Sequence, residues 1–170
     1  MKHLSLYDFL KKVRFTDKSI IQLIFDYDGI IYGGYLRDVI AGEEPTDIDV
    51  IIYKKDYEEF VYKLERKGYR FDSYIESHNI YTYSKTFSRD IQFHFFEDGD
   101  DGFIDAYQTA DCDVNCLAYD GNKLFNKRHP NASISKILSN IRNKRAIVNV
   151  EECDDRRFKK MTSKGYDLIY

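Results

Sequence analysis

Residues 32–52 contain two groups whose residue types and spacing suit chemistry. Gly33 and Gly34 form a pair, and Asp47 and Asp49 stand two residues apart at the start of an apolar run. A glycine pair between a strand and a helix lets backbone N–H groups approach an anion closely. Carboxylates at alternate strand positions point to one face, and Mg²⁺ prefers such oxygen ligands together with water and phosphates. The stretch therefore indicates metal-assisted chemistry on a nucleoside triphosphate.

A third carboxylate could join this pair from residues 89–96. There Asp90, Gln92 and His94 alternate with apolar residues, so a polar strand face lies opposite an apolar one. If this strand lies beside residues 47–53, Asp90 could complete a three-carboxylate site for two metal ions. Such a site activates an attacking hydroxyl and stabilises a leaving pyrophosphate. An edge strand with a hydrated outer face would show the same pattern, so both interpretations stay open.

The elements that must position these residues follow from periodicity and turn residues. Helical spacing predicts helices over residues 4–13, 18–25, 34–41, 56–67, 131–143 and 154–164, with caps at Ser5 and Asp56. Alternating or aromatic runs predict strands over 30–32, 47–53, 69–75, 79–85 and 89–96, and 97–102 is a loop. The expected fold is α+β: a mixed twisted sheet flanked by helices. We place one domain at 1–128 and a short, basic, helical extension at 129–170.

The length, charge and cysteine content of the chain limit the classes of protein to which it can belong. At 170 residues the chain can bury a real core, and its net charge is −3. Residues 121–170 hold 12 Lys and Arg against 5 Asp and Glu, a charge of +7, so the remainder carries −10. This asymmetry suits a nucleotide or nucleic-acid partner, although a solvated basic helix fits it equally. The three cysteines show no zinc-type spacing and are expected to be thiols.

Neither a membrane span nor a signal peptide is expected. No apolar stretch reaches spanning length, and the start MKHLSLYDFLKK is too short and too charged for a signal peptide. We therefore expect an intracellular, cytoplasmic protein without a membrane partner.

Three motifs, in this order, resemble the head domain of class II tRNA nucleotidyltransferases (CCA-adding enzymes) and bacterial poly(A) polymerases. That family's Gly-Gly-x-x-Arg-Asp and Asp-x-Asp are matched by residues 33–38 and 47–49. Its Arg-Arg-Asp-Phe-Thr-Ile-Asn-Ala-Leu motif is similar to TADCDVNCL at 109–117, and the start of its neck helix is similar to 154–157. The resemblance covers roughly residues 28–165.

The resemblance implies a nucleotidyltransferase fold of the DNA polymerase β type, with Mg²⁺ or Mn²⁺ as cofactor. It also implies a nucleoside triphosphate substrate and an RNA acceptor such as a tRNA 3′ end. Asp47 and Asp49 would be the catalytic metal ligands. The residues that would bind the nucleotide are Gly33, Gly34, Arg37, Asp38, Asp111 and Asn115.

The sequence also departs from the family pattern. Thr109 and Ala110 replace both arginines of the second motif, which removes a sugar or phosphate contact. The family's third carboxylate aligns with Gln92, and we expect Asp90, two residues earlier on the same face, to take its role as a catalytic metal ligand through a register shift or bulge. The sequence ends soon after the neck start, so template-free CCA synthesis by this chain alone is not expected.

Two functions therefore remain open. One is a minimal Mg²⁺-dependent nucleotidyltransferase that transfers a nucleoside monophosphate from a triphosphate to a hydroxyl and releases pyrophosphate. The other is a catalytically degenerate relative that binds nucleotide or RNA without turnover, with Gln92 in place of an essential carboxylate. Whether Asp90 reaches the metals separates them.

Overall fold

The computed structural model describes residues 5–96, 110–126, 133–149 and 155–170. Its strands are β1 (Ile30–Tyr32), β2 (Asp47–Tyr53), β3 (Arg70–Ile75), β4 (Ile80–Ser84), β5 (Asp90–Phe96), β6 (Ala118–Tyr119), β7 (Leu124–Phe125), β8 (Arg145–Ile147) and β9 (Asp167–Ile169). Its helices are α1 (Leu6–Lys12), α2 (Phe15–Asp26), α3 (Gly34–Ala41), α4 (Tyr57–Arg66), α6 (Ile134–Arg142) and α7 (Asp155–Ser163).

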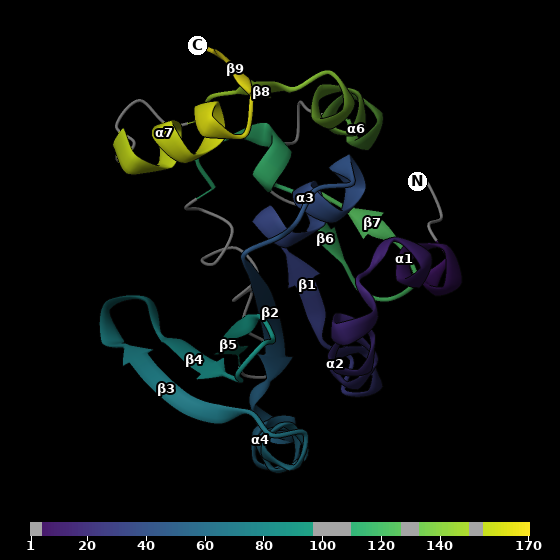
Figure 1. Cartoon of the computed structure of the whole chain (residues 1–170), viewed down its shortest axis with the longest axis vertical. Helices are drawn as coiled ribbons and strands as arrows, with labels where there is room; N and C mark the ends of the chain where they lie inside the picture. Colours follow the sequence, from purple (N-terminus) through teal and green to yellow (C-terminus); the bar gives the residue numbers. More distant parts are fainter. Residues whose placement is uncertain (1–4, 97–109, 127–132, 150–154) are drawn as a thin grey trace.

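Within these residues, seven strands form one mixed sheet in the order β3-β4-β5-β2-β1-β6-β7, and β8 pairs with β9 separately (Figure 1). The central strand β2 runs parallel to β5 on one side and antiparallel to β1 on the other. The predicted mixed sheet flanked by helices is confirmed. The strands that carry Asp49 and Asp90, whose neighbouring position the sequence left open, lie side by side.

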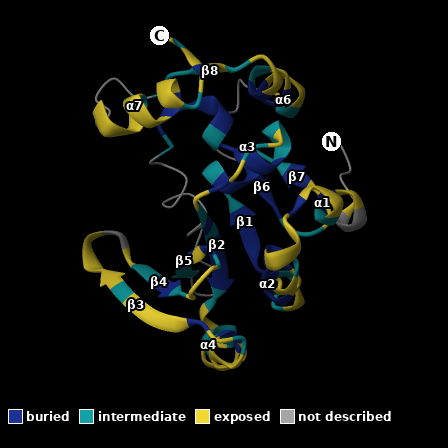
Figure 2. Cartoon of the chain, in the orientation of Figure 1, coloured by how far each residue is buried: buried dark blue, intermediate teal, exposed yellow. Residues whose placement is uncertain are grey.

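The two faces of the sheet differ in what covers them. Ile48, Val50 and Ile52 of β2 lie in the main core together with side chains from α1, α2, α3, α4, α6 and α7. On the other face Ile30, Ile51 and Ala118 form a small cluster whose described members all come from strands or strand ends. Figure 2 shows burial concentrated along β1, β2, β6 and β7, whereas β3 is largely exposed. The helices therefore pack on the face opposite Asp47 and Asp49.

The residues before three of the helices test the capping predicted from sequence. Ser5 caps α1 as predicted, because its hydroxyl accepts a hydrogen bond from the Asp8 backbone N–H. Ser133 does the same for α6 with Lys136. Asp56 precedes α4 but its side chain makes no capping bond, contrary to the prediction. It ends a 3₁₀ turn with φ −97° and ψ −1°, whereas a capping residue is normally extended.

The C-terminal part contains the two helices that were predicted and also the strands β8 and β9 that were not. Its Met161 and Tyr166 are buried in the main core, so α7 and the residues after it pack against the body of the molecule. The division at residue 128 stays a prediction. The expected loop at 97–102 and Cys153 lie outside the described residues. No helix of the described part is long and apolar enough to cross a membrane.

Candidate active site

The carboxylate pair lies beside the start of α3. Asp47 and Asp49 lie half-buried on one face of β2, and Asp49 stands opposite Tyr32 in the β1–β2 ladder. Gly33 follows Tyr32 directly and precedes the first residue of α3. The structure therefore brings the glycine pair and the aspartate pair together, as their spacing predicted.

Two features of the structure favour glycine at position 33. Its φ of 70° and ψ of −140° lie in a region that side-chain-bearing residues rarely adopt. A Cβ atom at this position would lie 3.3 Å from Oδ2 of Asp49, which is tighter than an ordinary contact. The conformation and the close approach of Asp49 both disfavour a side chain here.

The first residue of α3 is Gly34. The Gly33 backbone N–H donates to the carbonyl oxygen of Leu117 at 3.0 Å, so this amide is already used. The first N–H groups of a helix have no intrahelical acceptor, and the helix dipole adds partial positive charge there. The N–H groups of Gly34 and the residues that follow it are thus placed to receive an anion.

Electrostatic strain is concentrated at Asp49. Burial, followed by the negative charge of Asp47, raises the pKa of Asp49 to about 7. The positive charges of Lys160, Arg157 and Arg37 oppose this rise. A divalent cation between the two carboxylates would remove their repulsion, so the residues present fit Mg²⁺ or Mn²⁺.

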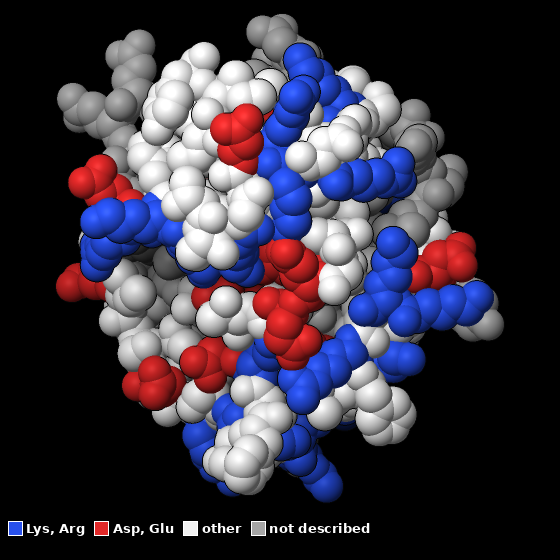
Figure 3. Space-filling view, turned by 45° about the horizontal axis from the view of Figure 1, so that its top comes forward, with Lys and Arg blue, Asp and Glu red and all other residues white. Residues whose placement is uncertain are grey.

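Sequence reasoning did not identify α7 as part of the site. Lys160 and Arg157 are exposed on α7, yet both are close enough to influence Asp49. In Figure 3 acidic side chains gather in the middle of the face shown, and Lys and Arg side chains lie on several sides of them. The neck-like motif at 154–157 was the only available signal, and it did not indicate that the helix returns to the neighbourhood of Asp49.

Arg37 is buried in a network of hydrogen bonds. Its Nε donates to Oδ1 of Asp38 at 2.7 Å, and its Nη1 donates to Oδ1 of Asn115 at 2.6 Å. The same Nη1 lies 3.1 Å from the sulfur of Met161 on α7. With 3% of its surface exposed, Arg37 joins α3 to two distant parts of the chain. A Cβ atom built on Gly34 would lie 3.5 Å from Nη2 of Arg37. The guanidinium charge therefore lies close to the first residue of α3.

The hydrogen-bond network of Arg37 extends beyond Asn115 and beyond Asp38. Asn115 Nδ2 donates to Oδ1 of Asp111 at 2.7 Å, and Lys164 Nζ donates to Oδ2 of Asp38 at 2.5 Å. The predicted residues Arg37, Asp38, Asp111 and Asn115 thus form one connected group. Lys164, which sequence reasoning missed, fixes the end of this group from the segment after α7.

Asp113 fixes the 3₁₀ turn Asp113–Asn115 that carries Asn115. Its side chain is fully buried and accepts hydrogen bonds from Asn140 Nδ2 on α6 at 2.7 Å and from the Ile147 backbone N–H on β8 at 2.8 Å. A buried carboxylate with two donors is costly to disturb. Asn115 is therefore presented to Arg37 by a rigid turn.

The strand register corrects one expectation. In the β2–β5 ladder Asp49 pairs with Gln92 and Asp47 pairs with Asp90, and the pairing is continuous from end to end. The predicted register shift or bulge is wrong, because β5 is held by regular ladders on both β2 and β4. Asp90 is exposed beside Asp47 at the strand start. Within the part of the chain that is described, no three His, Cys, Asp or Glu side chains are grouped closely enough to hold a metal ion.

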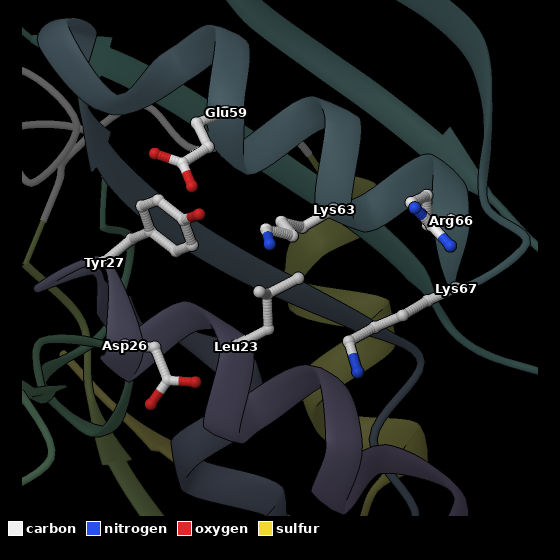
Figure 4. Close-up of a pocket in the computed structure, with 7 residues that line it drawn as sticks. All are labelled: Leu23, Asp26, Tyr27, Glu59, Lys63, Arg66 and Lys67. Carbon is white, nitrogen blue, oxygen red and sulfur yellow. The ribbon is translucent and has the colours of Figure 1, made fainter.

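A separate hollow of about 470 Å³ lies between α2 and α4 (Figure 4). It is lined by Leu23, Asp26, Tyr27, Glu59, Lys63, Arg66 and Lys67. None of the predicted site residues contributes to it, so it is distinct from the carboxylate pair.

The chain has the nucleotidyltransferase fold, as found in CCA-adding enzymes. An apo CCA-adding enzyme (form I) superposes with a TM-score of 0.68 at 13% identity, over 100% of this chain and 44% of that one. The Thermotoga maritima CCA-adding enzyme complexed with tRNA gives 0.69 at 12% identity, over 100% and 44%. A tRNA-processing enzyme in an apo form gives 0.54 at 17% identity, over 80% and 37%.

The chain spans less than half the length of these solved structures. No protein-family model and no curated protein sequence matches it. The likeness therefore shows the fold, and the activity must be argued from the site.

Proposed function

We propose that this chain is a divalent-metal-dependent nucleotidyltransferase that moves a nucleoside monophosphate from a triphosphate to a hydroxyl of RNA. The observation that carries the proposal is the placement of Asp47 and Asp49 on one strand face, with Asp49 directly beside the start of α3. A metal site and an anion site are thereby adjacent, as a metal–triphosphate substrate requires. Solved structures of the same fold include complexes of CCA-adding enzymes with ATP, CTP and tRNA, which supports this substrate class.

The metal would be held by Asp47 and Asp49, where burial and the mutual repulsion of the two carboxylates raise the pKa of Asp49 despite the nearby positive charges of α7 and Arg37. When bound, a divalent ion supplies charge stabilisation for the displaced pyrophosphate and acidifies the attacking hydroxyl. We propose Asp90 as a third ligand from its place beside Asp47, since its exposed side chain can rotate among staggered rotamers.

The chain's own residues position the substrate and neutralise its charge, which is most of what phosphoryl transfer needs from a protein. The N–H groups at the start of α3 would receive the triphosphate, with the buried charge of Arg37 behind them. Arg157 and Lys160 would add positive charge from α7. Asp111 and Asn115 would shape the nucleotide pocket and hold the Arg37 side chain in place.

One observation favours a second candidate, a nucleotide- or RNA-binding protein without turnover. Gln92 stands beside Asp49 where a carboxylate would complete the metal site. A glutamine can coordinate weakly through its amide oxygen but carries no negative charge and cannot act as a base.

The two candidates differ in a label-transfer experiment. The chain is incubated with each α-labelled ribonucleoside triphosphate, Mg²⁺ or Mn²⁺, and unfractionated tRNA or oligoadenylate, with EDTA in a parallel sample. The proposal predicts label in the RNA and release of pyrophosphate, both abolished by EDTA. Metal-dependent binding of triphosphate without any transfer would overturn the enzyme and favour the binding protein.

A further inference from the structure

The sheet face that carries the carboxylates also carries a group of half-buried rings. Tyr53 lies on the same face of β2 as Asp49, because side chains alternate along a strand. Tyr32 stands opposite Asp49 on β1, and His94 stands opposite Ile51 on β5. With Phe125 on β7, these rings form what we call the ring platform: Tyr32, Tyr53, His94 and Phe125.

The platform rests on a small apolar layer. Ile51 is 1% exposed, and Tyr32, Tyr53 and Phe125 pack against it and its neighbours. The Tyr32 and His94 ring centroids lie 6.1 Å apart across β2 at a tilt of 49°. The rings are thus fixed from below by the strands while their own surfaces remain partly accessible.

The platform runs from negative charge to positive charge. Asp49 lies at one end, and Lys55, which is exposed just after β2, places its Nζ 5.3 Å from the centre of the Tyr53 ring at the other. Four residues of extended strand, roughly 13 Å, separate Asp49 from Tyr53, and Lys55 lies in the 3₁₀ turn that follows. An ammonium above the edge of a ring platform suits a ligand that has both flat bases and phosphates.

We propose that the ring platform binds the unpaired 3′ segment of the RNA acceptor and leads its terminal hydroxyl to Asp47 and Asp49. The inference rests on the proposed function. It is favoured by the continuity of the platform with the carboxylate pair and by the charge of Lys55, which complements a phosphate. Bases of single strands stack on aromatic side chains that a sheet presents, and sequence need not matter for this contact.

The test is a binding titration of the whole chain, without nucleoside triphosphate, against a fluorescent single-stranded oligoadenylate. Tyr53→Ala should weaken binding about tenfold, the size expected for one lost base–ring stack, and Tyr53→Phe should bind as the wild type does. Phe15→Ala removes a ring that is 86% exposed on α2 and should change nothing. A double-stranded RNA of equal length should compete poorly, because its bases are not available for stacking.

Tyr53→Leu separates stacking from a merely structural cover. Leucine preserves apolar packing on Ile51 but offers no ring, so the proposal predicts the same loss as for alanine. Three results would each overturn the proposal: wild-type binding by Tyr53→Leu, equal weakening by Phe15→Ala, or competition by the duplex as strong as by the single strand. In each case the ring platform would have only a structural role, as a cover of the small apolar cluster. Unchanged thermal stability of Tyr53→Leu confirms that the comparison is between folded proteins.

Failure of this inference and failure of the proposed function give different results. Label transfer by the wild-type chain with RNA binding that is insensitive to Tyr53 would overturn the platform alone. Ring-dependent RNA binding without label transfer would overturn the enzymatic function and leave the platform standing.

Discussion

Arg37 and Asn115 lie 78 positions apart in the sequence, and Nη1 of Arg37 donates to Oδ1 of Asn115 at 2.6 Å. This bond joins the helix that follows the glycine pair to the 3₁₀ turn of the second motif. Asp38, Asp111 and Lys164 extend this hydrogen-bond network. The nucleotide-binding side chains proposed from sequence are therefore held together by hydrogen bonds.

Removal of Arg37 should therefore destabilise the protein. Arg37→Ala leaves Oδ1 of Asp38 and Oδ1 of Asn115 without the donor that Arg37 supplies, and it is expected to cost about 3 to 5 kcal/mol, the range for breaking a buried ion pair. Urea denaturation measures the loss. The control is Arg14→Ala, which removes an exposed pair with Glu44 and should cost far less. Wild-type stability together with lost triphosphate binding would instead make Arg37 a direct ligand with no structural role.

The two glycines that flank α3 provide a matched test of the site geometry. Gly33→Ala should cost about 1 to 3 kcal/mol through its backbone conformation and should also displace Asp49, lowering transfer about tenfold or more. Gly42→Ala, at φ 74° with nothing within 4 Å, should cost about 1 kcal/mol and leave transfer unchanged. Equal activity of the two variants would contradict the close contact between Gly33 and Asp49.

The raised pKa of Asp49 predicts an unusual pH dependence of stability. In the folded, metal-free protein the pKa of Asp49 is about 7, above its value in the unfolded chain, so folding favours the protonated form. The stabilisation is complete below the unfolded pKa and is lost as pH rises to about 7. In EDTA the free energy of unfolding should fall by about 1 to 2 kcal/mol between pH 5.5 and 8, seen as a lower melting temperature, and this fall should be smaller in Asp49→Asn. Mg²⁺ should restore stability at pH 8 in the wild type only.

Sequence patterns predicted the elements around the site because the signals there are local. The Gly33–Gly34 pair, Gly42 and the alternation over 47–53 each act within a few residues, and the strand, helix and strand lie where expected. Whether 47–53 and 89–96 are neighbours was left open by the sequence, and the structure pairs them in parallel.

The remaining features depend on contacts between distant residues. Met161 and Lys164 approach the Arg37–Asp38 pair across more than 120 positions, and no periodicity encodes that return of α7. The regular pairing of Asp49 with Gln92 is fixed by ladders on both sides of β5 rather than by the residues themselves. Strands β8 and β9 hold three residues each, too few to show an alternating pattern.

The proposed role of Asp90 as third metal ligand is tested by two substitutions on β5, one that removes a negative charge and one that adds one. If Asp90 serves from its place beside Asp47, Asp90→Asn should lower transfer about as much as Asp49→Asn, and Gln92→Glu should have little effect. Initial rates of label transfer at several Mg²⁺ concentrations give the comparison. Harmless Asp90→Asn with increased transfer by Gln92→Glu would instead show a weakened enzyme and favour the binding function.

The most direct test of the central claim is label transfer by the double variant Asp47→Ala, Asp49→Ala, beside Asp72→Ala as a control on the exposed strand β3. The double variant should be folded and, in EDTA at pH 8, at least as stable as the wild type, because it removes the repulsion that raises the pKa of Asp49. It should transfer no label with Mg²⁺ or Mn²⁺, whereas Asp72→Ala should match the wild type. Transfer by the double variant at the wild-type rate would contradict the assignment of Asp47 and Asp49 as the catalytic metal pair.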